Sequence, residues 1–149
     1  MSTKILIVDD STTDRLIICT MLAYYHILTA SDGLEAMELI TKSPDIDLVI
    51  LELNMPRMNG FEVLEALQKD PEHRKIRTII LTNYDEIDNE VKGLQLGAVD
   101  YIRKPLNIQS LLIRINIHIK LKRIQNRIEQ DNERLDALTS KRVYKPAYD

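Results

Sequence analysis

Several residue types and segments are scarce in this chain, and each scarcity excludes a class of protein. The 149 residues contain one cysteine, Cys19, so an internal disulfide is excluded. No apolar run approaches the roughly 18 to 20 residues that a membrane-spanning helix needs, and the start, MSTKILIVDD, is too short and acidic for a secretory signal. No G-x-G-x-x-G follows any expected strand, which argues against a dinucleotide-binding fold. We therefore expect a globular protein in the reducing cytoplasm, with Cys19 as a small hydrophobic residue in a helix.

The charges divide the chain into an acidic body and a basic tail. Residues 1–113 hold 11 Lys/Arg and 18 Asp/Glu, a net charge of −7, whereas residues 114–149 hold 9 and 5, a net charge of +4. A basic tail can bind nucleic acid, but it is more often a solvated helix face. Because the chain has no helix-turn-helix pattern, zinc-ligand spacing or interleaved aromatic residues, we do not expect it to bind nucleic acid.

Short aliphatic runs alternate with helical patterns over the first two thirds of the chain. The runs are residues 4–9, 25–30, 47–53, 77–83 and 99–104, and the expected helices are residues 11–24, 33–42, 60–69 and 88–96. Each interval is long enough for a helical crossover, so the alternation predicts a doubly wound α/β fold, a parallel sheet with helices on both faces. Ser11 is expected to cap the first helix and Gly97 to follow the end of the fourth.

The segment LLIRINIHIKLK, residues 111–122, is ambiguous because its apolar residues alternate as in a strand but also fit one face of a helix. The residues that follow favour a helix. Positions 117, 121, 124, 128, 131, 135 and 138 form a heptad seam in which only Asp131 is polar, and a polar core residue often fixes the register of a coiled coil. We predict a parallel two-stranded coiled coil over residues 117–139, and hence a homodimer; the alternative is a single amphipathic helix folded back on its own domain. Residues 140–149 lack periodicity and are predicted to be a linker or a disordered end.

Polar side chains stand at the carboxyl ends of four expected strands, the edge at which doubly wound sheets bind ligands. Asp9 and Asp10 end the first strand, Glu52 the third, Thr82 the fourth and Lys104 the fifth. Three converging carboxylates repel one another. A bound hard divalent cation, Mg²⁺ or Mn²⁺, would neutralise this repulsion most simply. A lysine and a hydroxyl opposite the cation would suit an anion such as a phosphoryl group.

These motifs resemble the receiver domains of two-component response regulators, the CheY-like family. The resemblance covers about residues 3–120 and is carried by VDD after the first strand, LNMPRMNG after the third, LTN at the fourth and DYIRKP at the fifth. It implies a flavodoxin-like five-stranded sheet in the order 2-1-3-4-5, with an extended C-terminal helix, and a receiver domain over residues 1–120. It also implies a signalling module rather than an enzyme, with a histidine kinase or phosphotransfer protein as partner.

By matching position, the resemblance also assigns roles to single residues. The metal ligands would be Asp9, Asp10, the carboxylate of Glu52 and the backbone carbonyl of Asn54. Thr82 and Lys104 would bind phosphoryl oxygens, and Tyr101 would turn inward as Thr82 moves towards the phosphoryl group. The peptide bond between Lys104 and Pro105 is expected to be cis, a conformation nearly confined to proline.

The largest departure from the family pattern is Glu52, because the phosphoacceptor at this position is an aspartate in the family. The extra methylene displaces the carboxylate, and a misplacement of about 1 Å can cost ~10²-fold in rate. Our first hypothesis is therefore a receiver that does not cycle efficiently through phosphorylation, in which Glu52 biases the switch formed by Thr82 and Tyr101.

Two other hypotheses remain open at this stage. One is an ordinary phosphorylatable receiver in which the aspartate at position 52 was replaced by engineering. The other is a Mg²⁺-dependent phosphohydrolase, although such enzymes typically place two aspartates one residue apart, whereas Asp9 and Asp10 are adjacent. The last residues, RVYKPAYD, contain no further domain, so we expect the output domain or partner to lie outside this chain.

Overall fold

Strands and helices alternate along the chain as the sequence pattern predicts. The computed structural model describes residues 3–83 and 85–143, without the side chains of 141–143. The strands are β1 (Lys4–Val8), β2 (His26–Ala30), β3 (Leu48–Glu52), β4 (Arg77–Asn83) and β5 (Asp100–Lys104). The helices are α1 (Thr12–Met21), α2 (Gly33–Lys42), α3 (Gly60–Gln68), the 3₁₀ helix η1 (His73–Lys75), α4 (Ile87–Gln95) and α5 (Ile108–Val143).

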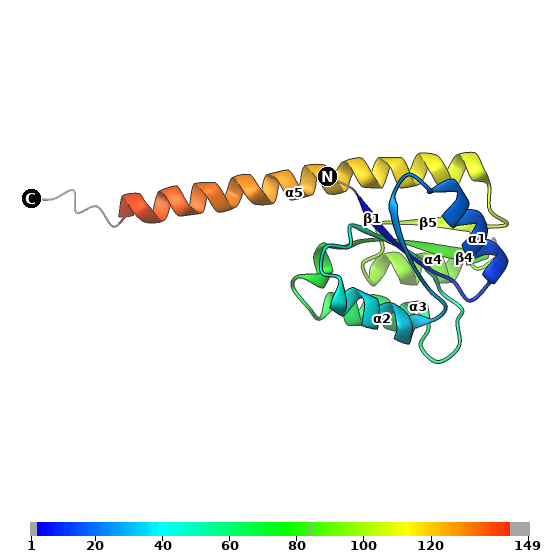
Figure 1. Cartoon of the computed structure of the whole chain (residues 1–149). Helices are drawn as coiled ribbons and strands as arrows, with labels where there is room; N and C mark the ends of the chain where they lie inside the picture. The colour runs from blue at the N-terminus through cyan, green and yellow to red at the C-terminus, as the bar shows by residue number, and fades with distance from the viewer. Residues whose placement is uncertain (1–2, 84, 144–149) are drawn as a thin grey trace, which may run out of the picture.

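The strands form one parallel sheet in the order β2-β1-β3-β4-β5, which confirms the predicted topology. The register aligns the carboxyl ends of neighbouring strands, because Glu52 lies opposite Leu81 and Asn83 lies opposite Lys104. In such a sheet ligands bind beyond these ends. The polar residues that end the strands are therefore held at one edge of the molecule (Figure 1).

Helices cover both faces of the sheet and create two separate cores (Figure 1). On one face Ile18 of α1 and Leu111 of α5 pack on strand residues that include Ile50. On the other face α2 and α3 pack on strand residues that include Leu51, so successive residues of a strand enter different cores. All five residues of β3 are buried, as expected for a central strand covered on both sides.

The local signals for helix ends agree with the structure. The Ser11 hydroxyl accepts a hydrogen bond from the backbone N–H of Asp14 at 3.2 Å, which confirms the predicted N-cap of α1. Gly97 follows α4 with φ of +110°, a backbone conformation that favours glycine. The peptide bond between Lys104 and Pro105 is cis, as expected.

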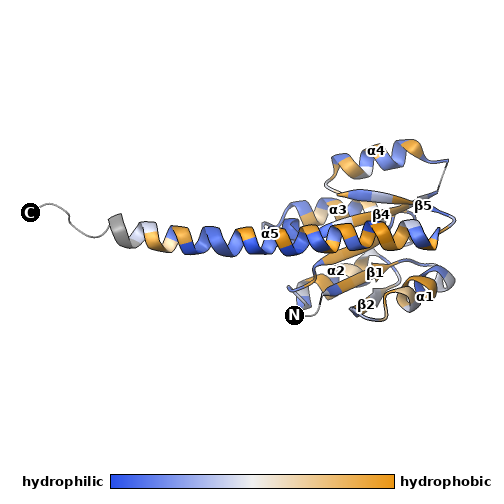
Figure 2. Cartoon of the chain, turned by 90° about the horizontal axis from the view of Figure 1, so that it is seen from above, coloured by the Kyte–Doolittle hydropathy of each residue, from blue (hydrophilic) through white to orange (hydrophobic). Residues whose placement is uncertain are grey.

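The ambiguous segment 111–122 is helical, and α5 explains its alternating pattern. Ile115 and Ile119 are buried against the sheet, whereas Ile113, Ile117 and Leu121 are exposed. The segment alternates because its helix has two apolar faces, of which the domain covers only one. Beyond the domain α5 continues as a projecting helix (Figures 1 and 2).

The described part of α5 reaches Val143, past the predicted end of the coiled coil at residue 139. Residues 144–149, the rest of the predicted linker or disordered end, lie outside the described residues. Among the helices of the described chain, none combines the length and the apolar composition that a membrane crossing requires.

Candidate functional site

Three of the predicted site residues, Asp9, Glu52 and Lys104, meet at the carboxyl edge of the sheet. Lys104 Nζ lies 3.0 Å from Asp9 Oδ2 and 3.4 Å from Glu52 Oε2. The three side chains share the face covered by α1 and α5, because each lies two residues after a core residue of that face: Ile7, Ile50 and Ile102. Asp9 is fully buried and Glu52 is nearly so. The sheet thus encloses two carboxylates and one ammonium group in one acidic pocket.

A fourth member of the pocket, Asp14, was not among the predicted site residues. It lies in the first turn of α1, and its Oδ2 is 2.8 Å from Lys104 Nζ, the shortest of the three ion pairs that the ammonium group makes. In the sequence Asp14 stands three residues after Ser11, where an acidic side chain is favoured near the start of a helix. Nothing in that local pattern indicates that the helix start faces the end of β5.

Burial makes the carboxyl group of Glu52 easier to protonate than that of an exposed glutamate. Burial raises the pKa of Glu52 from 4.5 to about 7; the positive charge of Lys104 opposes this rise, and the charge of Asp9 reinforces it. Within the described chain Glu52 Oε2 is buried without a hydrogen bond, since Lys104 reaches it only as an ion pair at 3.4 Å. Lys104 therefore compensates the negative charge of an ionised Glu52 only in part.

The two groups that flank Glu52 also have perturbed pKa values. Burial raises the pKa of Asp9, although hydrogen bonds from the Ser11 N–H and from Lys104 oppose the rise. Burial alone would lower the pKa of Lys104, but its contacts with Asp14, Glu52 and Asp9 outweigh burial and raise it above its ordinary value. Lys104 therefore carries a positive charge among three acidic groups.

The predicted metal ligands are only partly assembled. Asp10 and Asn54 are exposed, and the Asn54 amide donates to Glu86 Oε2 at 3.4 Å. In residues 3–83 and 85–143 no group of three or more His, Cys, Asp or Glu side chains is arranged to hold a metal ion. The donor chemistry nevertheless fits a hard cation. Asp9 and Glu52 are both buried carboxylates, Glu52 Oε2 accepts no hydrogen bond within the described residues, and carboxylate oxygens are the ligands that such cations prefer.

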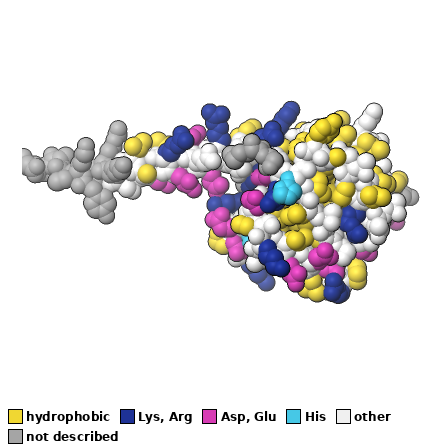
Figure 3. Space-filling model, in the orientation of Figure 1, with side chains coloured by type: hydrophobic (Ala, Val, Ile, Leu, Met, Phe, Trp, Pro, Cys, Tyr) yellow, Lys and Arg dark blue, Asp and Glu magenta, His cyan; other side chains and the backbone are white. Residues whose placement is uncertain are grey.

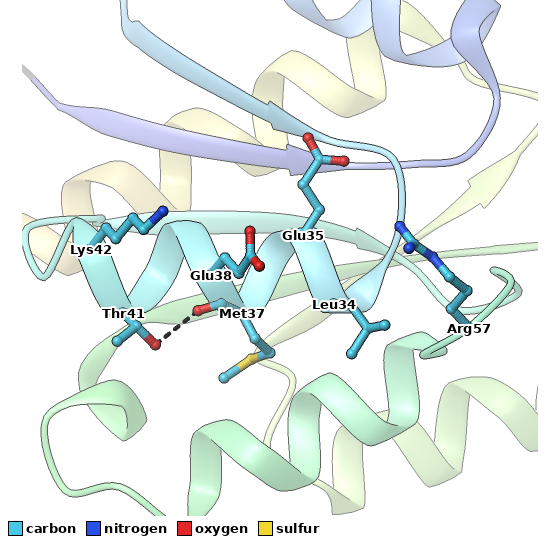
Figure 4. Close-up of a pocket in the computed structure, with 7 residues that line it drawn as sticks. All are labelled: Leu34, Glu35, Met37, Glu38, Thr41, Lys42 and Arg57. Carbon is cyan, nitrogen blue, oxygen red and sulfur yellow. Dashed lines mark hydrogen bonds between the residues drawn. The ribbon is translucent and has the colours of Figure 1, made fainter.

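The loop between β3 and α3 is pinned to the start of α2. Arg57, at φ of +65°, donates from Nε to Asp32 Oδ2 at 2.8 Å, and the Gly33 N–H donates to the Met58 carbonyl at 3.0 Å. Arg57 also borders a shallow surface groove along α2, which contains none of the predicted site residues (Figure 4). These contacts fix the loop that carries Asn54.

The two predicted switch residues lie on the opposite face of the sheet from Glu52. The buried hydroxyl of Thr82 donates to Glu90 Oε1 at 3.5 Å. Within the described residues it makes no hydrogen bond to Glu52 or Lys104. Tyr101 is half-buried against the core on this face. The structure therefore separates the expected site into an acidic pocket and a second cluster beside α4.

Comparison with known proteins identifies the family of this chain. Residues 5–116 match the family model described as "Response regulator receiver domain". A "Probable chemotaxis protein CheY" from Rhizobium etli is 37% identical over 111 residues, which are 72% of this chain and 85% of that protein. The solved structure of the chemotaxis response regulator CheY4 of Vibrio cholerae has a TM-score of 0.73 and 31% sequence identity, and the match covers 79% of this chain and 99% of that chain.

Other relatives are longer than this chain. A "Probable cyclic di-GMP phosphodiesterase" from Vibrio cholerae is 38% identical over 133 residues, which are 89% of this chain but only 30% of that protein. The chain also spans less than half of the "Probable transcriptional regulator ycf27" of Guillardia theta, at 43% of its length. The family match, the sheet order and the pocket at the strand ends agree: the chain belongs to the response regulator receiver domains of two-component signal transduction.

Proposed function

We propose that this receiver transmits a signal without efficient cycles of phosphorylation, because Glu52 occupies the phosphoacceptor position. The observation that carries the proposal is the position of the Glu52 carboxylate, which is buried at the end of β3 and lies 3.4 Å from Lys104. The longer side chain displaces the carboxylate from the place where an aspartate would meet the incoming phosphorus. A displacement of about 1 Å can cost ~10²-fold in rate.

The same carboxylate gives a direction to the proposed switch. It places negative charge beside Lys104, the residue expected to pair with a phosphoryl oxygen, and thereby favours one arrangement of Thr82 and Tyr101. Because the attraction within a buried ion pair is largely offset by the cost of desolvating its two charges, Glu52 shifts the two populations but does not complete the switch alone.

The proposal includes a divalent cation, Mg²⁺ or Mn²⁺, in the acidic pocket. Asp9, Asp10, the Glu52 carboxylate and the Asn54 backbone carbonyl would hold it, and its chemistry would be to neutralise negative charge at the phosphoryl site. Of these residues, Asp9 and Glu52 already face the pocket, whereas Asp10 is exposed and must turn towards it. Lys104, held by Asp14, would keep its ammonium group at the pocket wall.

Receiver domains act with histidine kinases or phosphotransfer proteins, and the proposed partner of this chain is of that class. The proposed location is therefore the cytoplasm, and the proposed role is signalling rather than catalysis. An output domain or separate partner would receive the signal; in the longer relatives the matched region is less than half of the protein.

The decisive experiment compares the chain with its Glu52→Asp variant. Each protein is incubated with a small acyl phosphate donor, with and without Mg²⁺, and its intact mass is measured. We expect the variant to gain the mass of one phosphate in the presence of Mg²⁺ and the chain with Glu52 to gain little. An equal, Mg²⁺-dependent gain by both proteins would refute the proposal.

A homodimer through α5 is the second part of the proposal. The heptad positions on the projecting helix are exposed apolar residues, with Asp131 as the exception: Ile117, Leu121, Ile124, Ile128, Leu135 and Leu138. The domain packs on a different face of the helix, through Ile115 and Ile119, so the seam is free to meet a second copy. Figure 3 shows charged side chains along the projecting part of α5, as expected for the solvated sides of a coiled coil.

Sedimentation velocity tests the dimer. The chain is expected to sediment as a dimer, and Ile124→Lys, which places a charge in the seam, is expected to shift it to the monomer. Ala137→Lys is the matched control, because it adds the same charge to an exposed position outside the seam. A monomeric parent chain, or equal dissociation by both variants, would contradict the coiled coil.

A further inference from the structure

A buried glutamate on α4, Glu90, contacts residues that neither the sequence motifs nor the family match assigns to it. Its side chain is only 5% exposed and accepts two hydrogen bonds from Arg103, from Nε at 2.6 Å and from Nη2 at 3.2 Å. The oxygen that accepts from Arg103 Nε, Oε1, also accepts from the hydroxyl of Thr82 at 3.5 Å. A buried carboxylate is costly unless it is paired, and Arg103 and Thr82 are the partners of this one.

Arg103 also contacts the ring of Tyr101. The guanidinium carbon of Arg103 lies 5.5 Å from the centroid of the Tyr101 ring, within the range of a cation–π contact. Thr82 lies two residues after Ile80, and Arg103 two residues after Tyr101, so strand alternation places all of these side chains on the face beside α4. A continuous series of contacts therefore runs from the Thr82 hydroxyl through Glu90 and Arg103 to the Tyr101 ring.

The geometry points to Glu90 as a positioning residue that couples Thr82 to Tyr101. This inference rests on the proposed function, in which these two residues form the switch. Glu90 holds the Thr82 hydroxyl on the α4 side of the sheet and, through the same carboxylate, holds Arg103 over the Tyr101 ring. When Thr82 moves towards the acidic pocket, Glu90 loses one donor, and its bonds to Arg103, and with them the contact on Tyr101, must readjust.

NMR of the full chain, with labelled threonine methyl groups and tyrosine rings, tests this coupling. Glu90→Met keeps a long, helix-compatible side chain but removes both acceptor oxygens, whereas Glu90→Gln keeps one acceptor. Asp88→Asn is the matched control, because it removes an exposed carboxylate from the same helix. We expect Glu90→Met to move the Thr82 methyl and Tyr101 ring resonances, Glu90→Gln to move them less, and Asp88→Asn to leave both in place.

A double-mutant cycle separates coupling from a merely structural effect. Thr82→Val removes the hydroxyl, and we expect it to shift the Tyr101 resonances in the parent chain and to shift them severalfold less in the Glu90→Met background. If Glu90→Met does not fold, the same cycle is run with Glu90→Gln. An equal Tyr101 response to Thr82→Val in both backgrounds, or no response in the parent chain, would overturn the inference.

These measurements need neither Mg²⁺ nor a phosphoryl donor. They can therefore fail while the mass comparison of the chain with its Glu52→Asp variant succeeds, and the reverse also holds. The two results distinguish a wrong coupling path from a wrong function.

Discussion

Replacement of Glu52 by glutamine is expected to change how stability depends on pH. Burial raises the pKa of Glu52 from 4.5 to about 7 in the folded chain, whereas the unfolded chain exposes the carboxyl to water. Between these two pH values the folded state binds more protons than the unfolded state, so the contribution of Glu52 to the free energy of unfolding falls as pH rises. This contribution is complete below pH 4.5 and is lost as the pH passes through 7.

The size of the effect follows from the pKa difference. Since one pH unit corresponds to about 1.4 kcal/mol, the rise from 4.5 to about 7 corresponds to a loss of about 3 kcal/mol across this window. The side chain of Glu52 is only 8% exposed, so solvent screens little of this cost. The Glu52→Gln variant has no proton to release at this position and should lack this loss.

Urea unfolding of both proteins, without divalent cations and at several pH values from 4.5 to 8, gives the difference in the free energy of unfolding. We expect this difference to change by about 3 kcal/mol in favour of the variant as the pH rises, because other titrating groups are common to both chains. Glu38→Gln, at an exposed position of α2, is the control and should give a constant difference. A constant difference for Glu52→Gln would refute the assignment of a buried, incompletely compensated carboxylate.

Three further outcomes are expected. Lys104→Met leaves Asp9 and Glu52 without their cation and should lower the free energy of unfolding by about 3 kcal/mol at pH 8. The loss should be smaller at pH 5, where Glu52 is mostly protonated, and urea unfolding at both pH values measures it. Gly60→Ala should lower the free energy of unfolding by about 1 to 3 kcal/mol. The added Cβ would lie 2.5 Å from the Glu52 carbonyl oxygen and 2.8 Å from Leu53 Cα, both backbone atoms. An unchanged urea unfolding midpoint would contradict this packing. Mg²⁺ at pH 8 should raise the urea midpoint of the parent chain more than that of Glu52→Gln, and equal increases would argue against Glu52 as a ligand.

The elements of the fold could be predicted from the sequence because their signals are local. Alternating aliphatic runs and helical intervals identified the five strands and the helices between them, and Ser11 and Gly97 marked helix ends that the structure confirms. The heptad spacing favoured a helix for residues 111–122, although alternation alone indicated a strand. The order of the strands came from the family resemblance, since the crossovers permit several orders.

The candidate site was predictable only in part, because its contacts depend on which face of the sheet each side chain occupies. The strand ends identified Asp9, Glu52 and Lys104, and the aligned register of the parallel sheet brought them together. Thr82 also ends a strand, but its position in the alternation places it beside α4, away from that pocket.

Local sequence signals were sufficient to predict the alternation of strands and helices, the heptad seam, and the acids and the lysine at the strand ends. Three contacts became evident from the folded chain alone: Asp14 with Lys104, Arg57 of the β3–α3 loop with Asp32, and Glu90 with both Thr82 and Arg103. Each of these pairs joins different elements, and no local periodicity encodes the distance between them. The raised pKa of Glu52 also depends on the tertiary structure, because it results from burial, and burial is a property of the packed chain and not of the residue.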